Sequence, residues 1–545
     1  MSAQRRRALL LGWAVLVWVA IFWRLGEPTF WDPDEAHYAI TTRELLASGD
    51  WLAPTYNGQP FFDKPILFHQ LQALTTLATS DPELGARLTP ALAALGLIGV
   101  TWWLGAALWG AETAYVAALL LTISPALVGL TRYAILDMLF TAFLFGGAAV
   151  LTVSALGRRP ALQWVGYVLL ALAVLTKGPV GLVLVALVFV VSIAVSGELR
   201  TRLLRLHWLL GAALVVGLSA PWFVYMYERF GAAFVTRYVL DENLLLFARA
   251  PYKNQPGWSF YLQIVAVGML PWTPALLGRL FDWCVDVWSG RANDLLETLL
   301  WCWVGAIIAF FSVSEFKLDH YVFPVAPALC LLCARSWAQA RADSTPGRHV
   351  GVRLGFALVG PTLILVGIAL GGVIAGLALP VASWALPVLW VVTGMMLTLS
   401  RRTRIGSAPG LVAVAFGALY AVVITAAAPV IERQKVVADV ARWVVEHAEP
   451  SAQICSYRLN RWNNSLLFYA NRHVTITDEP EGFQAFLTTT PRFLCVMPQS
   501  GYDELATLGM HLPVVHRRDG LWATSGRSLR RTGATRTPFL VVSGP

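Results

Sequence analysis

The chain has 545 residues, of which 57% are hydrophobic and only 13% are charged. Soluble globular domains carry about a quarter charged residues, so this composition excludes an ordinary soluble protein and indicates a polytopic membrane protein. The net charge of +9 does not indicate nucleic-acid binding. Most of the excess basic residues lie in short loops between apolar runs, where they orient a chain in the membrane.

Apolar runs long enough to cross a bilayer recur through the first four fifths of the chain and predict about thirteen transmembrane helices. The first run follows Arg5 to Arg7 and has no small-residue cleavage site after it, so we expect an uncleaved span. The expected spans are 8–25, 86–109, 113–131, 136–156, 161–176, 178–196, 207–227, 259–280, 296–313, 321–338, 353–377, 382–400 and 408–430.

Basic residues cluster on alternate loops between these spans. The clusters lie at 5–7, 158–159, 200–205, 291, 341–353 and 401–404. The positive-inside rule places them in the cytoplasm. The opposite side carries scattered single bases and the long loops, including the first loop at 26–85. We therefore expect the active site on the outer face, in that first loop above all.

The composition changes after residue 431. Strand-length apolar runs at 452–457, 493–497 and 512–516 alternate with helix-like stretches at 436–447, 465–471 and 502–508, whereas the tail 527–545 looks irregular. This alternation predicts a small soluble α/β domain at 432–545, after an all-α membrane domain at 1–431. An odd number of spans places the small domain outside the cytoplasm. Cys455 and Cys495 both fall in it, and a bridge between them is left open.

Three carboxylates arrive together after the first span, at Asp32, Asp34 and Glu35. The pattern is typical of a helix start, with Asp32 as N-cap, Pro33 at the first helical position and Glu35 three residues after the cap. That interpretation accounts for Asp32 and Glu35. It leaves Asp34 without a structural role.

Asp34 shares one helical face with His37 and Tyr38, at spacings of three and four residues. A helix at a bilayer surface with an inward polar face is suited to chemistry, and acids beside a membrane are functional candidates. We therefore favour a catalytic Asp34 over a purely structural one.

A single lysine, Lys64, lies between Asp63 and Pro65 in the same loop. An isolated interfacial lysine usually extends to lipid headgroups. A fixed ammonium group at the lipid boundary also suits a phosphate ligand. The two interpretations carry equal weight.

Further polar residues map to the outer ends of later spans. Asp137 can cap the fourth span with Arg132 as its partner, or it can form a second acid at the level of Asp34. Lys177, before a Gly-Pro pair, can anchor a turn or serve a site. Carboxylates and bases together suit a lipid-phosphate donor, because bases stabilise a phosphate leaving group and a carboxylate activates an acceptor.

These residues resemble those of GT-C class integral-membrane glycosyltransferases that use polyprenyl-phosphate sugars. The likeness is to the bacterial lipid A aminoarabinose transferases, which are related to protein O-mannosyltransferases. It rests on motifs between residues 30 and 325, and it extends over the whole chain through the topology. The motifs are Asp34-Glu35-Ala36-His37-Tyr38-Ala39, Asp63-Lys64-Pro65, Arg132-Tyr133 with Asp137, Lys177-Gly178-Pro179, and Lys317 to Pro324.

The resemblance implies a GT-C fold with periplasmic juxtamembrane helices, and Asp34 and Asp137 as catalytic acids. It implies that the carrier phosphate is bound by Lys64, Lys177, Arg249 and Tyr321. The other substrate-binding candidates are Glu35, His37, Tyr38, Arg132 and Lys317.

One stretch departs from the family pattern. Asn243 and Leu246 stand where the aminoarabinose enzymes have a histidine and an arginine. The arginine meets the carrier phosphate, and Arg249 is a candidate to replace its charge. In those enzymes the histidine helps hold a metal beside an acid that corresponds to Asp63 here. Because Asn243 replaces the histidine, no cofactor is expected with certainty, and a divalent metal is left open. Aminoarabinose as the sugar is in doubt for the same reason.

The resemblance thus implies transfer of a sugar from polyprenyl (undecaprenyl) phosphate to lipid A, another glycolipid or a protein, on the periplasmic face of a bacterial inner membrane. The alternatives are a transporter or flippase, and a lipid-binding assembly factor without activity. Transporters place polar groups at the midplane, whereas the polar residues here cluster at one interface, which favours the enzyme. The sugar, the acceptor, the oligomeric state and the role of the C-terminal domain are left open.

Overall fold

The computed structural model describes residues 3–249, 255–290, 294–342, 349–400, 406–459, 463–522 and 537–544. It divides into two compact units that are not continuous in sequence. Unit 1 comprises Met1–Trp23, Phe62–Phe68 and Thr89–Ala426, and unit 2 comprises Arg24–Phe61, His69–Leu88 and Ala427–Pro545. Most of the first outer loop therefore folds with the C-terminal residues, whereas a boundary drawn at residue 431 places it with the spans.

Nine helices in the described part of the chain are long and apolar enough to cross a membrane. They are α4 (Pro82–Leu108), α7 (Asp137–Leu156), η2 with α8 (Pro160–Lys177), α11 (Trp208–Phe230), α16 (Leu295–Val313), η4 with α17 (Asp319–Ala342), α18 (Val350–Gly376), η5 with α19 (Val381–Leu399), and α21 to α22 (Ala408–Glu432). Two bent pairs pass the same test, α5 (Ala111–Thr122) with α6 (Pro125–Thr131) at 58°, and α14 (Phe260–Gly268) with α15 (Thr273–Trp288) at 115°.

Two shorter apolar helices complete the set. They are Arg7–Phe22, which is most of α1 (Ala3–Val17) and η1 (Trp18–Phe22), and α9 (Val180–Val195). Every predicted span therefore has a helical counterpart, and the predicted polytopic helical domain is confirmed. The run 259–280 is not one straight helix, because Pro271 lies at the break and a proline cannot continue a helix from within it. The remaining helices of unit 1 are α10 (Gly197–Leu203), α12 (Ala232–Phe234), η3 (Val235–Leu245) and α13 (Leu246–Ala248).

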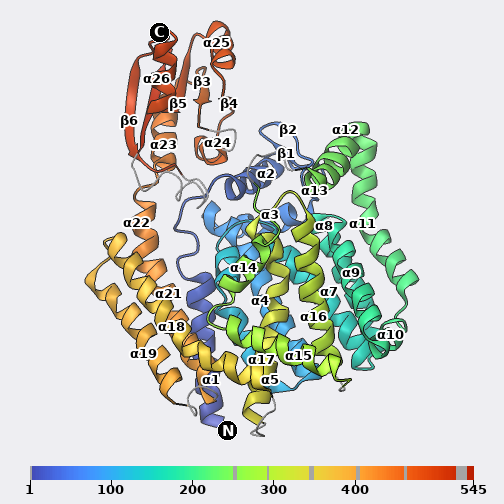
Figure 1. Cartoon of the computed structure of the whole chain (residues 1–545). Coiled ribbons are helices and arrows are strands. Elements are labelled where there is room, and N and C mark those ends of the chain that lie inside the picture. The colour runs from blue at the N-terminus through green and yellow to red at the C-terminus, as the bar shows by residue number, and fades with distance from the viewer. Residues whose placement is uncertain are drawn as a thin grey trace. The chain divides into compact units, whose positions relative to one another are not determined.

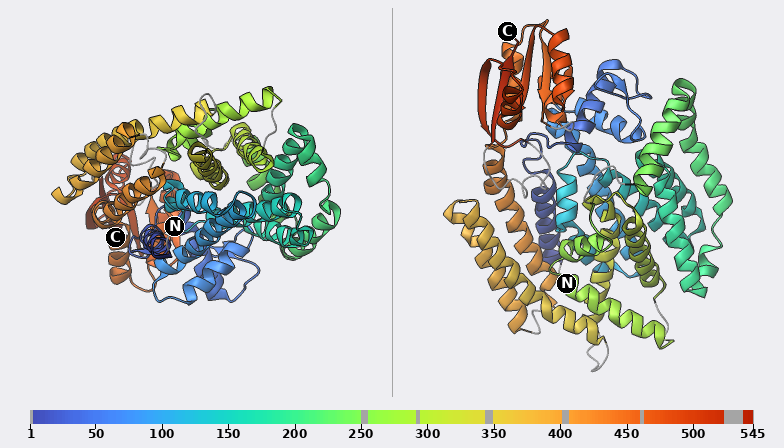
Figure 2. Two further views of the ribbon diagram at one scale, coloured as in Figure 1. Left: turned by 90° about the horizontal axis from the view of Figure 1, so that it is seen from below. Right: turned by 45° about the horizontal axis from the view of Figure 1, so that its top comes forward.

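Small residues let the helices of unit 1 approach closely. Helices α7 and α8 pack side by side (Figure 1), and a Cβ on Gly147 would lie 3.0 Å from the carbonyl oxygen of Gly166. Helices α18 and α19 also lie together (Figure 2), and there Gly360 and Gly394 would each place a Cβ 2.6 Å from the other's carbonyl oxygen. Such contacts replace the hydrophobic driving force that lipid cannot supply between helices.

The C-terminal part of unit 2 is a five-stranded mixed sheet in the order β4-β3-β5-β7-β6. The strands are β3 (Gln453–Tyr457), β4 (Val474–Thr477), β5 (Phe493–Pro498), β6 (Val514–Gly520) and β7 (Thr537–Ser543). Strand β3 runs parallel to β4 and β5, and β7 runs antiparallel to β5 and β6. Cys455 and Cys495 are direct partners in the register of β3 and β5, and both are buried free thiols.

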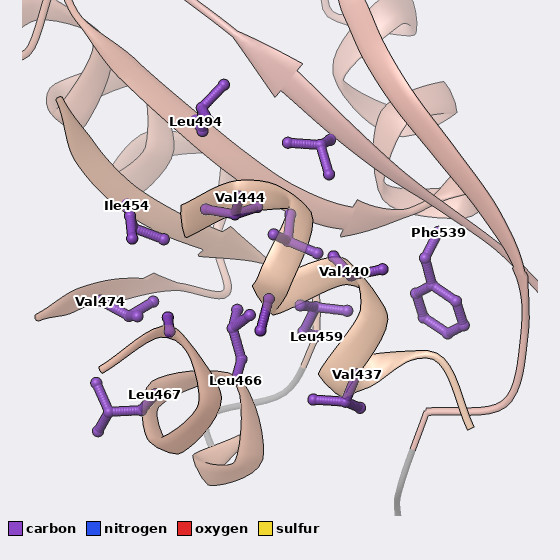
Figure 3. Packing of buried hydrophobic residues seen from close by; sticks show 14 of the residues in the cluster. Val437, Val440, Val444, Ile454, Leu459, Leu466, Leu467, Val474, Leu494 and Phe539 are labelled. Carbon is purple, nitrogen blue, oxygen red and sulfur yellow. The ribbon is translucent and has the colours of Figure 1, made fainter. Parts of the chain in front are cut away.

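Helices cover both faces of this sheet. Helices α23 (Val437–His447) and α24 (Asn464–Ala470) pack on one face, and α25 (Pro480–Thr489) and α26 (Gln499–Thr507) pack on the other. Val437, Val440 and Val444 of α23 repeat at helical spacing and meet Ile454 of the sheet (Figure 3). The predicted α/β domain is confirmed. The prediction of an irregular tail is wrong at 537–543, which form β7, and residues 527–536 and 545 lie outside the described residues.

The first outer loop supplies the rest of unit 2. It contains α2 (Asp34–Ser48), the hairpin of β1 (Thr55–Tyr56) and β2 (Gln59–Pro60), and α3 (Leu67–Leu77), whose first two residues belong to unit 1. Asn57 and Gly58 form the hairpin turn with φ of 50° and 73°, the left-handed backbone that a tight antiparallel turn requires. The helices expected beside the membrane are α2 and α3.

Candidate active site

The charged centre of unit 1 lies where the first residue of one helix meets the last residue of a neighbouring helix. Asp137 is the first residue of α7, and Lys177 is the last residue of α8. The Lys177 ammonium donates directly to the Asp137 carboxylate, and the two side chains are only 12% and 8% exposed. Their helices bring together two groups that are forty residues apart in the sequence.

Gly178 ends α8 and fixes the position of Lys177. Its φ is +100°, and a Cβ there would lie 2.3 Å from the Tyr238 hydroxyl. Only glycine adopts that conformation readily and leaves room for the tyrosine. The Lys177-Gly178-Pro179 motif therefore has a structural reason as well as a chemical one.

The turn η4 adds two side chains to this centre. The Nε2 atom of His320 lies 3.6 Å from the Asp137 carboxylate. The ring of Tyr321 lies 4.4 Å from the Lys177 ammonium, within the range of a cation–π contact. The sequence predicted Tyr321 near a phosphate site, whereas His320 lay within the motif from Lys317 to Pro324 and was assigned no role.

Lys64 forms the second ion pair of unit 1. Its ammonium donates to the Glu242 carboxylate at 3.0 Å and to the Asp63 carbonyl oxygen at 2.8 Å. Burial lowers the pKa of Lys64, but the negative charges of Glu242, Asp63 and Asp137 together raise that pKa above its ordinary value. Lys64 is therefore a fixed cation near neutral pH.

Three other predicted residues of unit 1 contact backbone or solvent. Arg132 donates to the carbonyl oxygen of Trp23 at 3.0 Å, just after the end of η1, and Lys317 is buried and donates to the carbonyl oxygen of Ser314. Arg249 is exposed at the end of α13. Their predicted contacts with substrate stay predictions.

The residues around Lys64 do not fit a zinc site. Asn243 donates its side-chain amide to the Tyr238 carbonyl oxygen at 2.6 Å, and Glu242 is engaged with Lys64. Within the described ranges, no group of three or more His, Cys, Asp or Glu side chains is arranged to hold a metal ion. A carboxamide is in any case a poor zinc ligand beside imidazole or thiolate.

The acidic segment lies in unit 2, where Asp34 is the half-buried first residue of α2. The predicted N-cap role of Asp32 is wrong, because Pro33 occupies that position. Asp32 is instead fully buried and accepts hydrogen bonds from Ser465 of α24, at 2.7 Å from the backbone nitrogen and 2.5 Å from Oγ. Burial raises the pKa of Asp32 to about 7, although the bonds from Ser465 oppose that rise.

Glu35 pairs with an arginine that the sequence reasoning missed. Arg87 donates to both carboxylate oxygens, at 2.5 and 2.9 Å, and the two side chains are 1% or less exposed. Arg87 also donates to the carbonyl oxygens of Leu25 and Pro28. This geometry favours a positioning role for Glu35 over substrate contact. An arginine inside a predicted span was the available signal.

His37 and Tyr38 pack against aromatic neighbours in the same loop. The His37 ring lies 4.3 Å from the Tyr56 ring and 5.3 Å from the Phe61 ring, between centroids. The Tyr38 ring lies 5.6 Å from the imidazole of His69. These contacts fix the side chains that follow Asp34 on α2.

Comparisons with known proteins identify what the chain is similar to. The family model for dolichyl-phosphate-mannose-protein mannosyltransferase matches residues 11–236. An undecaprenyl phosphate-α-4-amino-4-deoxy-L-arabinose arabinosyl transferase of Sodalis glossinidius is 28% identical over 339 residues, 60% of this chain and 59% of that protein. The chain spans about three fifths of the length of the curated relatives it matches.

Two solved structures share the fold over almost the whole chain. The apo structure of ArnT from Cupriavidus metallidurans has a TM-score of 0.76 at 21% identity, covering 99% of this chain and 98% of that one. The structure of the same protein bound to undecaprenyl phosphate has a TM-score of 0.72 at 23% identity, with the same coverage. The resemblance predicted from the sequence is thereby confirmed: the chain is similar to the mannosyltransferase family over residues 11–236 and to bacterial aminoarabinose transferases over about three fifths of its length, and it has the ArnT fold.

Proposed function

We propose that this chain is a glycosyltransferase that moves a sugar from a polyprenyl phosphate carrier to an acceptor on the periplasmic face of a bacterial inner membrane. The observation that carries the proposal is the pair of lysines in unit 1, Lys64 and Lys177, each held against a carboxylate. The relatives support it, because they include an undecaprenyl phosphate-α-4-amino-4-deoxy-L-arabinose arabinosyl transferase, and ArnT from Cupriavidus metallidurans has been solved bound to undecaprenyl phosphate.

In the proposed reaction the bond between the sugar carbon and the carrier oxygen breaks, and a bond to the acceptor oxygen forms. The departing carrier phosphate gains negative charge. Lys64 and Lys177 stabilise that charge, and the Tyr321 ring beside Lys177 shapes the same centre. Arg249 is a further candidate for the phosphate, because it follows the stretch that lacks the family's arginine.

The carboxylates take the complementary roles. Asp34 accepts the proton of the acceptor hydroxyl or stabilises positive charge at the sugar carbon, either of which lowers the barrier of transfer. Asp137 is the second proposed acid, and its ion pair gives it the additional task of holding Lys177 in place. His37, Tyr38, Arg132 and Lys317 remain candidates for contacts with the sugar or the acceptor.

The sugar is a pentose or hexose, and the acceptor is lipid A, another glycolipid or a protein. Asn243 and Leu246 occupy the positions at which the family pattern has a histidine and an arginine. We infer that this chain contacts the phosphate or the sugar differently from the aminoarabinose enzymes there.

The test separates binding from transfer. Purified protein in lipid nanodiscs is given a panel of labelled undecaprenyl-phosphate sugars and a bacterial membrane extract, and released undecaprenyl phosphate is measured. Lys64→Ala should weaken binding of undecaprenyl phosphate and slow transfer, because the lysine acts on donor and leaving group alike. Asp34→Asn should bind undecaprenyl phosphate as the parent does and transfer at least about a hundredfold more slowly, the range expected for a catalytic acid or base.

Asp50→Asn is the matched control, because Asp50 lies in the same loop and its carboxylate accepts from the backbone nitrogens of Leu52 and Ala53. It should transfer sugar at the parent rate. Normal transfer by Asp34→Asn, or no release of undecaprenyl phosphate by the parent from any sugar of the panel, contradicts the proposal.

A further inference from the structure

Helix α24 of the C-terminal domain is bound at both ends by the first outer loop. At its N-terminus, Asp32 accepts hydrogen bonds from the backbone and hydroxyl of Ser465. At its C-terminus, Arg43 of α2 donates to the carbonyl oxygen of Phe468 at 2.6 Å, with its guanidinium carbon 4.9 Å from the Phe468 ring centre. Asp32 thus satisfies a backbone N–H in the first turn of α24, and Arg43 adds a donor to a carbonyl oxygen in the last turn, which also accepts from the backbone nitrogen of Asn471.

Asn464 holds the residue immediately before Asp34. Its side-chain nitrogen donates to the Pro33 carbonyl oxygen at 2.9 Å, and its side-chain oxygen accepts from the Tyr56 hydroxyl at 2.5 Å. Asn464 is 1% exposed, so water does not compete for these bonds. Since Pro33 is the N-cap of α2, the bond from Asn464 fixes the point at which the helix of Asp34 begins.

Apolar and ionic contacts hold the segment on either side of Asp34. Leu466 of α24 and Val440 of α23 lie in one apolar cluster below the sheet (Figure 3). Ile40, farther along α2, is fully buried in the same cluster. Before Asp34, Lys435 donates to the Thr29 carbonyl oxygen at 2.6 Å, and its ammonium lies 4.5 Å from the Trp31 ring centre. The segment from Thr29 to Arg43 is therefore fixed by residues more than 390 positions away in the sequence.

We infer that α24 of the C-terminal domain positions the Asp34 segment for transfer, with Asn464 and Ser465 as positioning residues. The inference rests on the proposed function of Asp34. Its physical basis is that a reacting group must be held within a fraction of an ångström by side chains that are themselves fixed by packing and hydrogen bonds. The C-terminal domain thereby acquires a role in the reaction without contacting the substrate.

The experiment compares the loss of two hydroxyl groups of the C-terminal domain, in the full-length protein in nanodiscs. Ser465→Ala removes the hydroxyl bond to Asp32. Tyr457→Phe removes a hydroxyl that donates to Glu504 of α26, on the other face of the sheet from α24. Ser465→Thr restores the hydroxyl, and Asn464→Ala is an independent variant of the same helix end.

Each variant is examined by three measurements and by its melting temperature. Hydrogen exchange is followed at the amides of Ala36 and His37, which bond to the carbonyl oxygens of Trp31 and Pro33. Undecaprenyl phosphate affinity and single-turnover transfer are measured on the same preparations. Asp34→Asn is run alongside.

Ser465→Ala and Asn464→Ala should speed exchange at both amides and slow single-turnover transfer by about tenfold, which is what a buried bond to a charged or backbone group contributes. Their undecaprenyl phosphate affinity should stay within about twofold of the parent, because no phosphate ligand has been changed. Ser465→Thr should recover both properties, and Tyr457→Phe should change neither beyond any loss of melting temperature.

The inference is overturned if Ser465→Ala and Tyr457→Phe behave alike, or if Ser465→Ala and Asn464→Ala transfer normally while Asp34→Asn does not. Normal transfer by Asp34→Asn is a different failure. It removes the proposed role of Asp34 and with it the role assigned to α24, whatever the exchange rates are. Should Ser465→Ala fail to fold, Asn464→Ala decides the same question.

Discussion

The ion pair between Glu35 and Arg87 allows a direct test of whether Glu35 has a structural role or contacts the substrate. Glu35→Gln keeps the size of the side chain but removes the carboxylate that the buried Arg87 guanidinium contacts directly. Both side chains are 1% or less exposed, and breaking such a pair costs about 3–5 kcal/mol. Arg87 keeps its bonds to two backbone carbonyl oxygens, so we expect the lower end of that range.

The assay is thermal unfolding in detergent at one fixed scan rate, with undecaprenyl phosphate affinity measured below the transition. A loss of about 3 kcal/mol should lower the melting temperature by several degrees. The matched control is Glu27→Gln, because Glu27 pairs with Arg24 in the same loop but is more than half exposed. Exposed pairs contribute less than about 1 kcal/mol, so this variant should melt near the parent.

The double variant Glu35→Gln with Arg87→Met should recover part of the loss, since it removes the stranded charge as well as its partner. Equal melting temperatures for Glu35→Gln, Glu27→Gln and the parent refute the reasoning. Weakened transfer by Glu35→Gln at an unchanged melting temperature would instead make Glu35 a substrate ligand.

Three further predictions concern individual charges and one glycine. Burial raises the pKa of Asp32 to about 7 from 3.8, so the folded state favours the neutral acid. Its contribution to stability is complete below pH 3.8 and is lost as the pH rises through 7, by up to about 4 kcal/mol. Asp32→Asn should therefore make the melting temperature depend less on pH between pH 4 and 8. The same pH dependence in the variant and the parent contradicts this. Glu242→Gln removes the carboxylate 3.0 Å from Lys64 and should tighten undecaprenyl phosphate binding in a direct titration, whereas weaker binding would mean that Glu242 places the lysine. Gly178→Ala should destabilise the protein by about 1–3 kcal/mol and lower its melting temperature, because the φ of Gly178 is +100° and the added Cβ meets the Tyr238 hydroxyl. A melting temperature equal to the parent's would show that the turn tolerates a side chain.

Lys64 and Asp137 show how far a sequence leads toward a site. Asp137 was found as a charged residue at the end of an apolar run, and Lys64 as a single lysine beside Asp63 and Pro65 in the first loop. The partners were not readable. Glu242 is nearly 180 residues from Lys64, and Lys177 is forty residues from Asp137. Pairing depends on which helix ends meet, and that is a property of packing.

Asp32 shows how a correct local pattern can mislead. The order Asp-Pro-Asp-Glu is typical of a helix start, and α2 does begin there, but the Asp32 side chain binds α24 instead of its own helix. A cap needs only a carboxylate near unpaired backbone N–H groups, and a neighbouring helix supplies them as well as the adjacent one.

The sequence by itself determined the spans and the small α/β domain. A bilayer demands about twenty apolar residues for each crossing and strands need alternating short runs, and both signals are local. The tertiary structure alone decided that the loop of Asp34 folds with the C-terminal domain, that α7 and α8 bring Asp137 to Lys177, and that Arg87 holds Glu35. Those outcomes follow from contacts between distant segments, whose energies depend on shape and burial that no local pattern records.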